Sequence, residues 1–183
     1  MNIDLFDEII KSHHQYSDSD LWKAIQQATG CTELEAKSAA RVHCNSLSFY
    51  ALCRARGFIM FGYSTWIEKL TEAGILNPLT GWLSGSKLKI AELFGFKDEF
   101  NDLRYYINYD RFVNAIGLDP EKGYNIKIYN NHNKDNLPGK GDHFMGGYIL
   151  DGKMYISDSS NRGIRVEMKS VIPREKFQWG MPV

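Results

Sequence analysis

The sequence predicts an α+β fold in which helices from the N-terminal part pack against an antiparallel sheet from the C-terminal part. Apolar residues recur at helical spacing up to about residue 104, and short Tyr- and Ile-rich runs with strand-like alternation follow. Hydrophobic residues make up 43% of the 183 residues, which is enough for one core. We therefore expect a single domain over residues 1–183, with residues 1–30 as an N-terminal helical extension.

Two helices are expected within the first 30 residues, because apolar side chains repeat there on one helical face. The apolar positions are Leu5, Ile9 and Ile10 in the first helix and Leu21, Trp22 and Ile25 in the second. A cap-like run of Ser and Asp over residues 17–20 precedes the second helix, and Gly30 suits its end.

The central part of the chain predicts a short helix followed by a buried one. Thr32 and Glu35 have the spacing of a capping box, so a helix begins near residue 32. Polar residues then interrupt the helical pattern, which predicts a turn near residues 42–44. A buried helix follows over about residues 44–56 and stops at Gly57.

Capping patterns and stop residues indicate further helices. Thr65 and Glu68 form a second capping-box pattern, for a helix that closes at Gly74. Residues 77–81 predict a loop around Trp82. Two short helices are expected over residues 86–94 and 109–116, each followed by a glycine.

Strand-like segments dominate after residue 104. We expect strands at residues 104–107, 124–129, from 143 onward and 164–168, and a short helix or packed irregular segment over 171–179. Residues 130–141 form a polar loop with Gly and Pro, and a loop of that length in a compact domain is often functional.

Asp151-Gly152 lies between two alternating runs and predicts a two-residue β-hairpin, because a type I′ turn needs positive φ at both central positions. Counted from this turn, Met145 lies opposite Asp158 and His143 lies opposite Ser160. Opposed residues point to the same face of a sheet. His143 and Asp158 are therefore expected to be diagonal neighbours, with Cβ atoms about 7 Å apart.

An imidazole that a carboxylate holds in place is the base-and-orienter part of a catalytic triad. A single histidine at the start of a strand is, however, more often an ordinary polar residue with its hydrogen bonds satisfied. The carboxylate on the same face supports the catalytic interpretation, and both interpretations stay open for His143 and Asp158. The catalytic one requires a nucleophile.

Cys44 is the candidate nucleophile among the three cysteines. It begins the expected buried helix, where unpaired N–H groups and the helix dipole stabilise a thiolate and can bind an oxyanion. Cys53 lies deep in the same helix, as a small buried apolar residue does, and Cys31 sits at a helix junction. Three irregularly spaced cysteines do not favour a disulfide framework.

Together these residues resemble the papain-like cysteine peptidase superfamily. The shared features are a Cys at the head of a central helix, a long gap, Gly-Asp-His-Phe at 141–144 and Ser-Asp-Ser at 157–159, within about residues 40–165. The nearest branches are bacterial: cell-wall peptidases, bacteriocin-leader peptidases and small bacterial and phage proteins. The resemblance implies a papain-like fold with Cys44 as nucleophile, His143 as general base and Asp158 as the residue orienting the imidazole.

The sequence departs from that family around the nucleophile. Many members carry a Gln a few residues upstream for the oxyanion hole, whereas the nearest glutamines here are Gln26 and Gln27. Asn45 or backbone N–H groups are the local candidates for this role, and Trp82 is a candidate wall of a substrate groove. His43, directly before Cys44, is near enough in sequence to tune the thiol, but we interpret it as an exposed or packing residue.

The expected function is thiol-dependent hydrolysis of an amide bond in a peptide, an isopeptide or a peptidoglycan stem peptide. One alternative is a papain-like binding or inhibitory module without turnover, such as one that engages a host protein, and the missing Gln favours it. The other alternative is acyl transfer or deamidation by the same three residues.

Composition bears on partners and location. Lys+Arg and Asp+Glu both number 22, so the net charge of +0 does not favour nucleic acid or an anionic membrane as partner. Cys and His residues lack paired metal-ligand spacing, so no metal or cofactor is expected. The acidic N-terminal segment does not resemble a secretory signal, and we expect a cytoplasmic protein that lysis could release.

Overall fold

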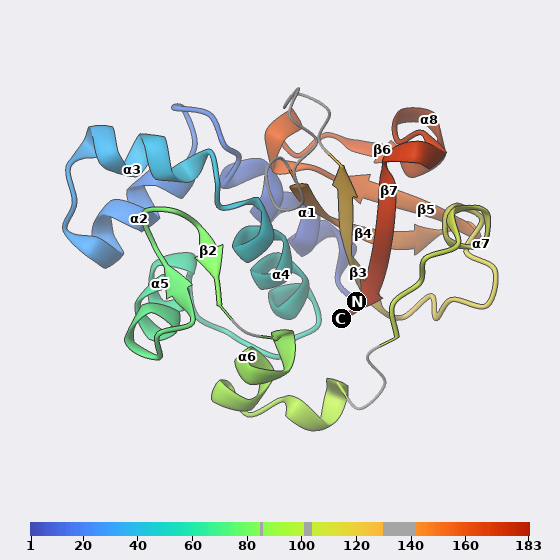
Figure 1. The fold of residues 1–183 in the computed structure, drawn as a ribbon, viewed down its shortest axis with the longest axis horizontal. Helices are drawn as coiled ribbons and strands as arrows, with labels where there is room; N and C mark the ends of the chain where they lie inside the picture. Colours follow the sequence, from blue (N-terminus) through green and yellow to red (C-terminus); the bar gives the residue numbers. More distant parts are fainter. Residues whose placement is uncertain (85, 101–103, 130–141) are drawn as a thin grey trace.

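The computed structural model describes residues 1–84, 86–100, 104–129 and 142–183. The fold is α+β, with eight α-helices among these residues and a five-stranded antiparallel sheet in the order β6-β5-β4-β3-β7. Figure 1 shows most of the helices on one side of the molecule and the sheet on the other, with α4 (Cys44–Ala55) between them. The predicted α+β class, with helices packed against an antiparallel sheet, is therefore confirmed.

The other helices and the strands have the following bounds. The α-helices are α1 (Ile3–Ser12), α2 (Leu21–Thr29), α3 (Glu33–Ala40), α5 (Tyr63–Glu72), α6 (Lys87–Leu93), α7 (Tyr109–Val113) and α8 (Met168–Val171). Three 3₁₀ helices are η1 (Lys97–Phe100), η2 (Ser159–Asn161) and η3 (Arg174–Lys176). The strands are β1 (Leu76–Asn77), β2 (Trp82–Leu83), β3 (Gly123–Tyr129), β4 (Asp142–Leu150), β5 (Lys153–Ser157), β6 (Arg165–Glu167) and β7 (Phe177–Pro182).

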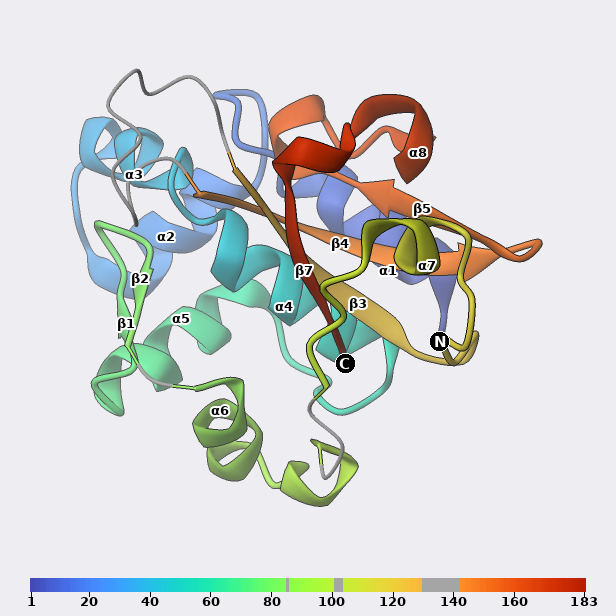
Figure 2. The same ribbon diagram turned by 45° about the vertical axis from the view of Figure 1, so that its right-hand side comes forward.

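Both faces of the sheet are covered. The helical face packs against α1 and α4, while α7 and α8 lie on the opposite face (Figure 2). Phe6 of α1 is fully buried, and a Cβ added at Gly146 of β4 would come within 2.3 Å of its ring. Because a glycine at this position leaves room for the ring, α1 is part of the main core of the domain.

Several predicted boundaries agree with the structure. The capping box of Thr32 and Glu35 opens α3, and the helix after the turn begins at Cys44. Asp151 and Gly152 have φ values of 49° and 73°, as a type I′ turn requires, and Gly147 pairs with Ile156 in the expected register. The chain geometry that carries the candidate site was therefore predicted from local signals.

Other local predictions were wrong. Thr65 and Glu68 do not cap α5. The N-cap of α5 is Gly62, three residues before Thr65, and Tyr63 is already helical and buried. The loop predicted over 77–81 is present as a turn over 78–81, but the residues on either side of it, in β1 and β2, pair as a short antiparallel hairpin that carries Trp82.

The predicted strand at 104–107 and the predicted tail also need correction. At 104–107 there is no strand but a single β-bridge between Tyr106 and Gly180, and most of this segment faces solvent. The tail from residue 171 contains η3 but then continues as β7, which adds to the sheet beside β3 with a register shift between Lys127 and Ile128. The predicted loop over 130–141 lies outside the described residues.

Within the described part of the chain, no helix has the length and apolar character needed to cross a membrane.

Candidate active site

The N-terminus of α4 places Cys44 at the edge of the core. The first hydrogen bond inside the helix runs from the Leu47 N–H to the His43 carbonyl at 2.9 Å, so the N–H groups of residues 44–46 have no partner within the helix. Cys44 is 9% exposed and lines a surface hollow of about 430 Å³. The thiol is therefore packed by the core on one side and open to the hollow on the other.

His43, the residue before Cys44, is fully buried and acts as packing. Its Nε2 lies 2.7 Å from the Pro78 carbonyl oxygen, and its Nδ1 lies 3.1 Å from the Tyr63 hydroxyl. A carbonyl only accepts, so Nε2 donates to Pro78 and Nδ1 accepts from Tyr63. Burial lowers the pKa of His43 to about 4, only partly offset by the bond to Pro78, so the ring is neutral near pH 7.

The β1–β2 hairpin is pressed against the turn that precedes Cys44. Gly81 has a φ of 65°, and a Cβ added there would lie 2.3 Å from the Val42 carbonyl oxygen. Only glycine permits this approach. The contact and the His43–Pro78 bond together join the hairpin to the start of α4, and Trp82 of the hairpin reaches the hollow of Cys44.

His143 and Asp158 are brought together as the hairpin register predicted, although the strand ladder ends earlier. The last pair of β4 and β5 is Gly146 with Ser157, and Asp158 follows as the N-cap of η2. The Oδ1 atom of Asp158 lies 2.6 Å from His143 Nε2 and also accepts from the Ser160 N–H at 2.8 Å. These bonds place the carboxylate against one ring nitrogen and fix its orientation.

The imidazole of His143 is also next to Cys44. Burial alone would lower the pKa of His143, but the hydrogen bonds with Asp158 and Cys44 outweigh it and raise the pKa to about 10. Burial likewise opposes ionisation of Asp158, yet the bond to His143 keeps the pKa of this carboxyl below its usual value. The arrangement thus favours an imidazolium between a carboxylate and a sulfur.

Ser160 is a fourth polar contact in this cluster. Its hydroxyl donates to Asp158 Oδ2 at 2.7 Å and lies 3.4 Å from His143 Nε2. The register predicted it opposite His143, without a role. The hydroxyl occupies the second carboxylate oxygen, so Oδ1 is left for the imidazole and the Ser160 N–H.

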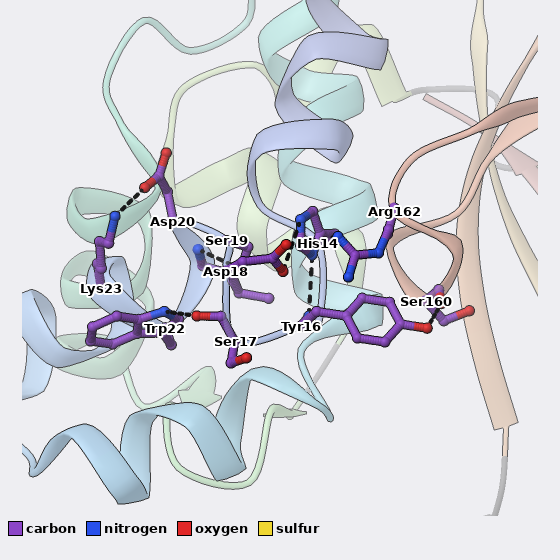
Figure 3. A network of polar contacts seen from close by, with 11 residues as sticks. His14, Tyr16, Ser17, Asp18, Ser19, Asp20, Trp22, Lys23, Ser160 and Arg162 are labelled. Carbon is purple, nitrogen blue, oxygen red and sulfur yellow. Dashed lines mark hydrogen bonds and ion pairs between the residues drawn. The ribbon is translucent and has the colours of Figure 1, made fainter.

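The segment between α1 and α2 holds the turn that carries Asp158 and Ser160 (Figure 3). Tyr16 donates its hydroxyl to the Ser160 carbonyl at 3.0 Å, and Arg162 forms an ion pair with Asp18 at 2.7 Å. The guanidinium of Arg162 also lies 4.7 Å from the Tyr16 ring centre. Residues far apart in the sequence therefore set the position of the carboxylate.

The hollow at Cys44 has walls from three parts of the chain. These are the turn before α4 with the first residues of that helix, the β1–β2 hairpin, and the end of β3 with the start of β4. Trp82 of the hairpin is 68% exposed at the rim. Lys127 and Asp142 form an ion pair of 2.7 Å on the sheet side. A large exposed aromatic ring beside a half-open cleft suits contact with a polymer chain.

A second hollow, of about 630 Å³, is lined by the segment between α1 and α2, by α3 and by Ser160. Ser160 borders it at the His143 side, and Tyr16, Trp22 and Leu34 supply apolar surface. Arg41 and Lys37 are its charged lining residues, and Lys37 is paired with Glu33. Cys44 thus lines the smaller hollow, while Ser160, which contacts His143 and Asp158, lines the larger one.

Asn45 and Lys87 form a polar pair beside the hollow of Cys44. Asn45 lines the hollow directly after Cys44, and its Oδ1 accepts from Lys87 Nζ at 2.6 Å. Sequence reasoning proposed Asn45 but missed Lys87. A signal was present, since Lys87 shares the apolar stripe of α6 with Ile90, Ala91 and Phe94, where a lysine is unexpected.

The remaining cysteines are placed differently from Cys44. Cys53 is fully buried in α4, and burial raises the pKa of its thiol. Cys31 is half-buried at the junction of α2 and α3. Among the described residues, no group of three His, Cys, Asp or Glu side chains is arranged to hold a metal ion.

No protein-family model, curated protein or solved structure matches this chain.

Proposed function

We propose that this protein is a cysteine-dependent amide hydrolase with a papain-like arrangement of its helices and sheet. Cys44 is the nucleophile, His143 is the general base and acid, and Asp158 orients the imidazole. The substrate is a peptide, either a protein segment or a peptidoglycan stem peptide. We also propose that residues 40–165 are related to the papain-like superfamily, in which a cysteine at the head of a central helix faces a histidine on the sheet.

One observation carries this proposal: His143 bonds to the Asp158 carboxylate at 2.6 Å and lies near enough to the thiol at the start of α4 for Cys44 to raise its pKa. Asp158 uses Nε2 of the ring, which leaves Nδ1 as the nitrogen for the sulfur. A histidine between a carboxylate and a thiol at a helix N-terminus is the arrangement that activates a cysteine nucleophile.

The reaction follows from these contacts. The Cys44 sulfur attacks the carbonyl carbon as a thiolate, and its proton resides on His143. The tetrahedral intermediate collapses when His143 donates that proton to the leaving nitrogen, which breaks the C–N bond and leaves a thioester. Water then gives a proton to His143 and attacks the thioester carbonyl. The C–S bond breaks, which releases the carboxylic acid and restores the Cys44 thiolate beside the protonated His143.

The oxyanion of the tetrahedral intermediate needs hydrogen-bond donors near Cys44. The backbone N–H groups at the start of α4 have no partner within the helix and lie beside the thiol. Asn45 lines the same hollow and carries an amide NH₂. Asn45 therefore takes the part that an upstream Gln plays in the family that this chain resembles.

The two hollows suggest how a peptide crosses the site. The leaving amine must lie on the imidazole side, because His143 protonates it. Ser160, which contacts His143, borders the larger hollow, whereas Cys44 and Trp82 line the smaller one. We infer that the acyl part of the peptide contacts Trp82 and that the amine part lies in the hollow of Tyr16 and Trp22.

The test is selective reaction of the thiol followed by turnover. Iodoacetamide at pH 6–8 should alkylate Cys44 faster than Cys31, as measured by time-resolved peptide mapping, and Cys44→Ala should lose the fast phase. Cys31→Ala is the matched control and should keep it. Peptide and muropeptide libraries should then show cleavage that Cys44→Ala abolishes.

Two outcomes would count against the proposal. Slow alkylation of Cys44 throughout this pH range would mean that the thiol is not activated. Fast alkylation without cleavage of any amide, together with tight binding of a peptide by both the unmodified protein and Cys44→Ala, would favour a binding module over an enzyme.

A further inference from the structure

We propose that Lys87 is a positioning residue that holds the side-chain amide of Asn45 so that its NH₂ group faces the oxyanion formed at Cys44. This inference rests on the proposed function. It concerns a residue on α6, outside the cluster of Cys44, His143 and Asp158.

The contacts of Lys87 are specific. Its Nζ donates to Asn45 Oδ1 at 2.6 Å and lies 4.5 Å from the ring centre of Phe49. Asn45 and Phe49 are four residues apart on α4 and so share one face of that helix. The ammonium group is therefore located beside the first turn of α4, between the amide and an aromatic ring.

The chemistry of the two groups sets the orientation of the amide. In its protonated form a lysine has three donors and no acceptor, so protonated Lys87 can bind only the oxygen of Asn45. With Oδ1 held by Lys87, Nδ2 lies on the other side of the planar amide and keeps both N–H donors for another acceptor. An asparagine without such a partner can rotate and present either atom to the hollow.

Lys87 sits at a costly position for a lysine. Its end is half-buried against α4, and among the described residues no carboxylate pairs with it. Burial lowers the pKa of Lys87 to about 7, with the nearby thiols Cys53 and Cys44 acting in the opposite direction. A Met or Leu would cover Phe49 equally well, so packing alone does not account for an amine here.

Two reactions at the Cys44 thiol distinguish the effect of the Asn45 amide on the oxyanion from the reactivity of the thiolate itself. Alkylation by iodoacetamide displaces iodide at a carbon atom and forms no oxyanion, whereas acylation by p-nitrophenyl acetate passes through a tetrahedral oxyanion. Both can be followed at Cys44, by peptide mapping and by the burst of p-nitrophenol. Lys87→Met keeps the side-chain length and removes the donor.

Lys87→Met should slow acylation of Cys44 on the order of 10- to 100-fold while alkylation stays within about twofold. Asn45→Ala should slow acylation by a similar factor, and the double variant should be no slower than Asn45→Ala alone, because Lys87 acts through the amide. The matched control is Lys89→Met, an exposed lysine on the same helix, which should change neither rate.

A second variant covers the case in which Lys87→Met does not fold. Asn45→Asp keeps an oxygen for Lys87 but removes the NH₂ donors, so it should fold and still lose acylation more than alkylation. Acylation at the unmodified rate in folded Lys87→Met, or an equal loss of both reactions, would overturn the inference. If the unmodified protein does not acylate at Cys44 at all, the proposed function itself fails.

Discussion

Two histidines lie close to Cys44, and they differ in the charge of their partners. His43 bonds to a carbonyl and a hydroxyl, and burial lowers its pKa to about 4. His143 bonds to the carboxylate of Asp158, and although burial acts in the same direction, its pKa rises to about 10. Both rings are largely buried, with 0% exposure for His43 and 12% for the side chain of His143.

The difference teaches that burial does not decide whether a histidine near a thiol is charged. Neutral partners leave the desolvation of His43 uncompensated, so the ring stays neutral and serves as a hydrogen-bonded link between α4, α5 and the hairpin. At His143 the anionic carboxylate of Asp158 compensates the desolvation of the ring and favours its protonated form. In the proposed function, the first histidine holds the start of α4 in place and the second one takes up the proton of the Cys44 thiol.

The largest effect is expected when the charged partner of His143 is replaced by a neutral one, since the partners of His43 are neutral. Asp158→Asn keeps an oxygen for the imidazole but removes the charge, so the pKa of His143 should fall. Alkylation of Cys44 by iodoacetamide at pH 7 and any amide cleavage should drop on the order of 10²- to 10⁴-fold. NMR titration of the His143 ring protons measures the pKa. An unchanged titration would contradict the role given to Asp158.

Removing the other ring should affect stability more than chemistry. His43→Ala leaves a cavity and takes the partners from the Tyr63 hydroxyl and the Pro78 carbonyl, which should cost about 2–4 kcal/mol of unfolding free energy. Urea denaturation measures this loss. Alkylation of Cys44 in the folded fraction should fall less than it does in Asp158→Asn, and the opposite order would reverse the two roles.

The pH dependence of stability should show the two rings with opposite signs. The unfolded pKa of both is 6.5, and the folded pKa of His43 is lower, so stability should fall by roughly 2–3 kcal/mol between pH 6.5 and 4. The folded pKa of His143 is higher, so its contribution is complete below pH 6.5 and is lost as pH rises toward 10. Urea midpoints measured across this range test both signs.

Two variants show which histidine causes the acid decline in stability and which causes the alkaline one. His43→Ala should lose the decline between pH 6.5 and 4.5, a window that lies above the range in which Asp158 becomes protonated. Asp158→Asn should lose the alkaline decline. A profile that both variants leave unchanged would mean that other groups control it.

The smallest effect is expected from the segment that supports Asp158. Tyr16→Phe removes the hydroxyl that bonds to the Ser160 carbonyl, at a partly exposed position. This should cost about 0.5–1 kcal/mol of unfolding free energy and change the alkylation rate of Cys44 less than tenfold. Tyr129→Phe, at an exposed tyrosine of β3, is the control and should change neither quantity.

Local signals in the sequence predicted the parts of the site that depend on short-range geometry. The Asp151-Gly152 turn sets the register of β4 and β5, and this register brings His143 near Asp158. The interruption before Cys44 predicted the start of α4. In each case a few neighbouring residues determine the backbone conformation, so periodicity and turn chemistry suffice.

Features that depend on distant pairing were not predictable in this way. β7 contains Gly180 and Pro182 and becomes a strand through its position beside β3, where Tyr124 pairs with Pro182 at the end of the ladder. The burial of His43 depends on Tyr63 and Pro78, which meet it only in the folded chain. Tertiary contacts, and not local propensity, decide these positions.

The contact of Gly81 with the Val42 carbonyl has a consequence for the selection of ligands. Because two backbones touch there, the hairpin that carries Trp82 cannot shift without moving the residue two positions before Cys44. We therefore expect a preformed surface whose shape is the same before and after a ligand arrives. Ligands would lose little affinity to ordering of this wall, and bulky groups that do not match its contour would be rejected before any bond is made.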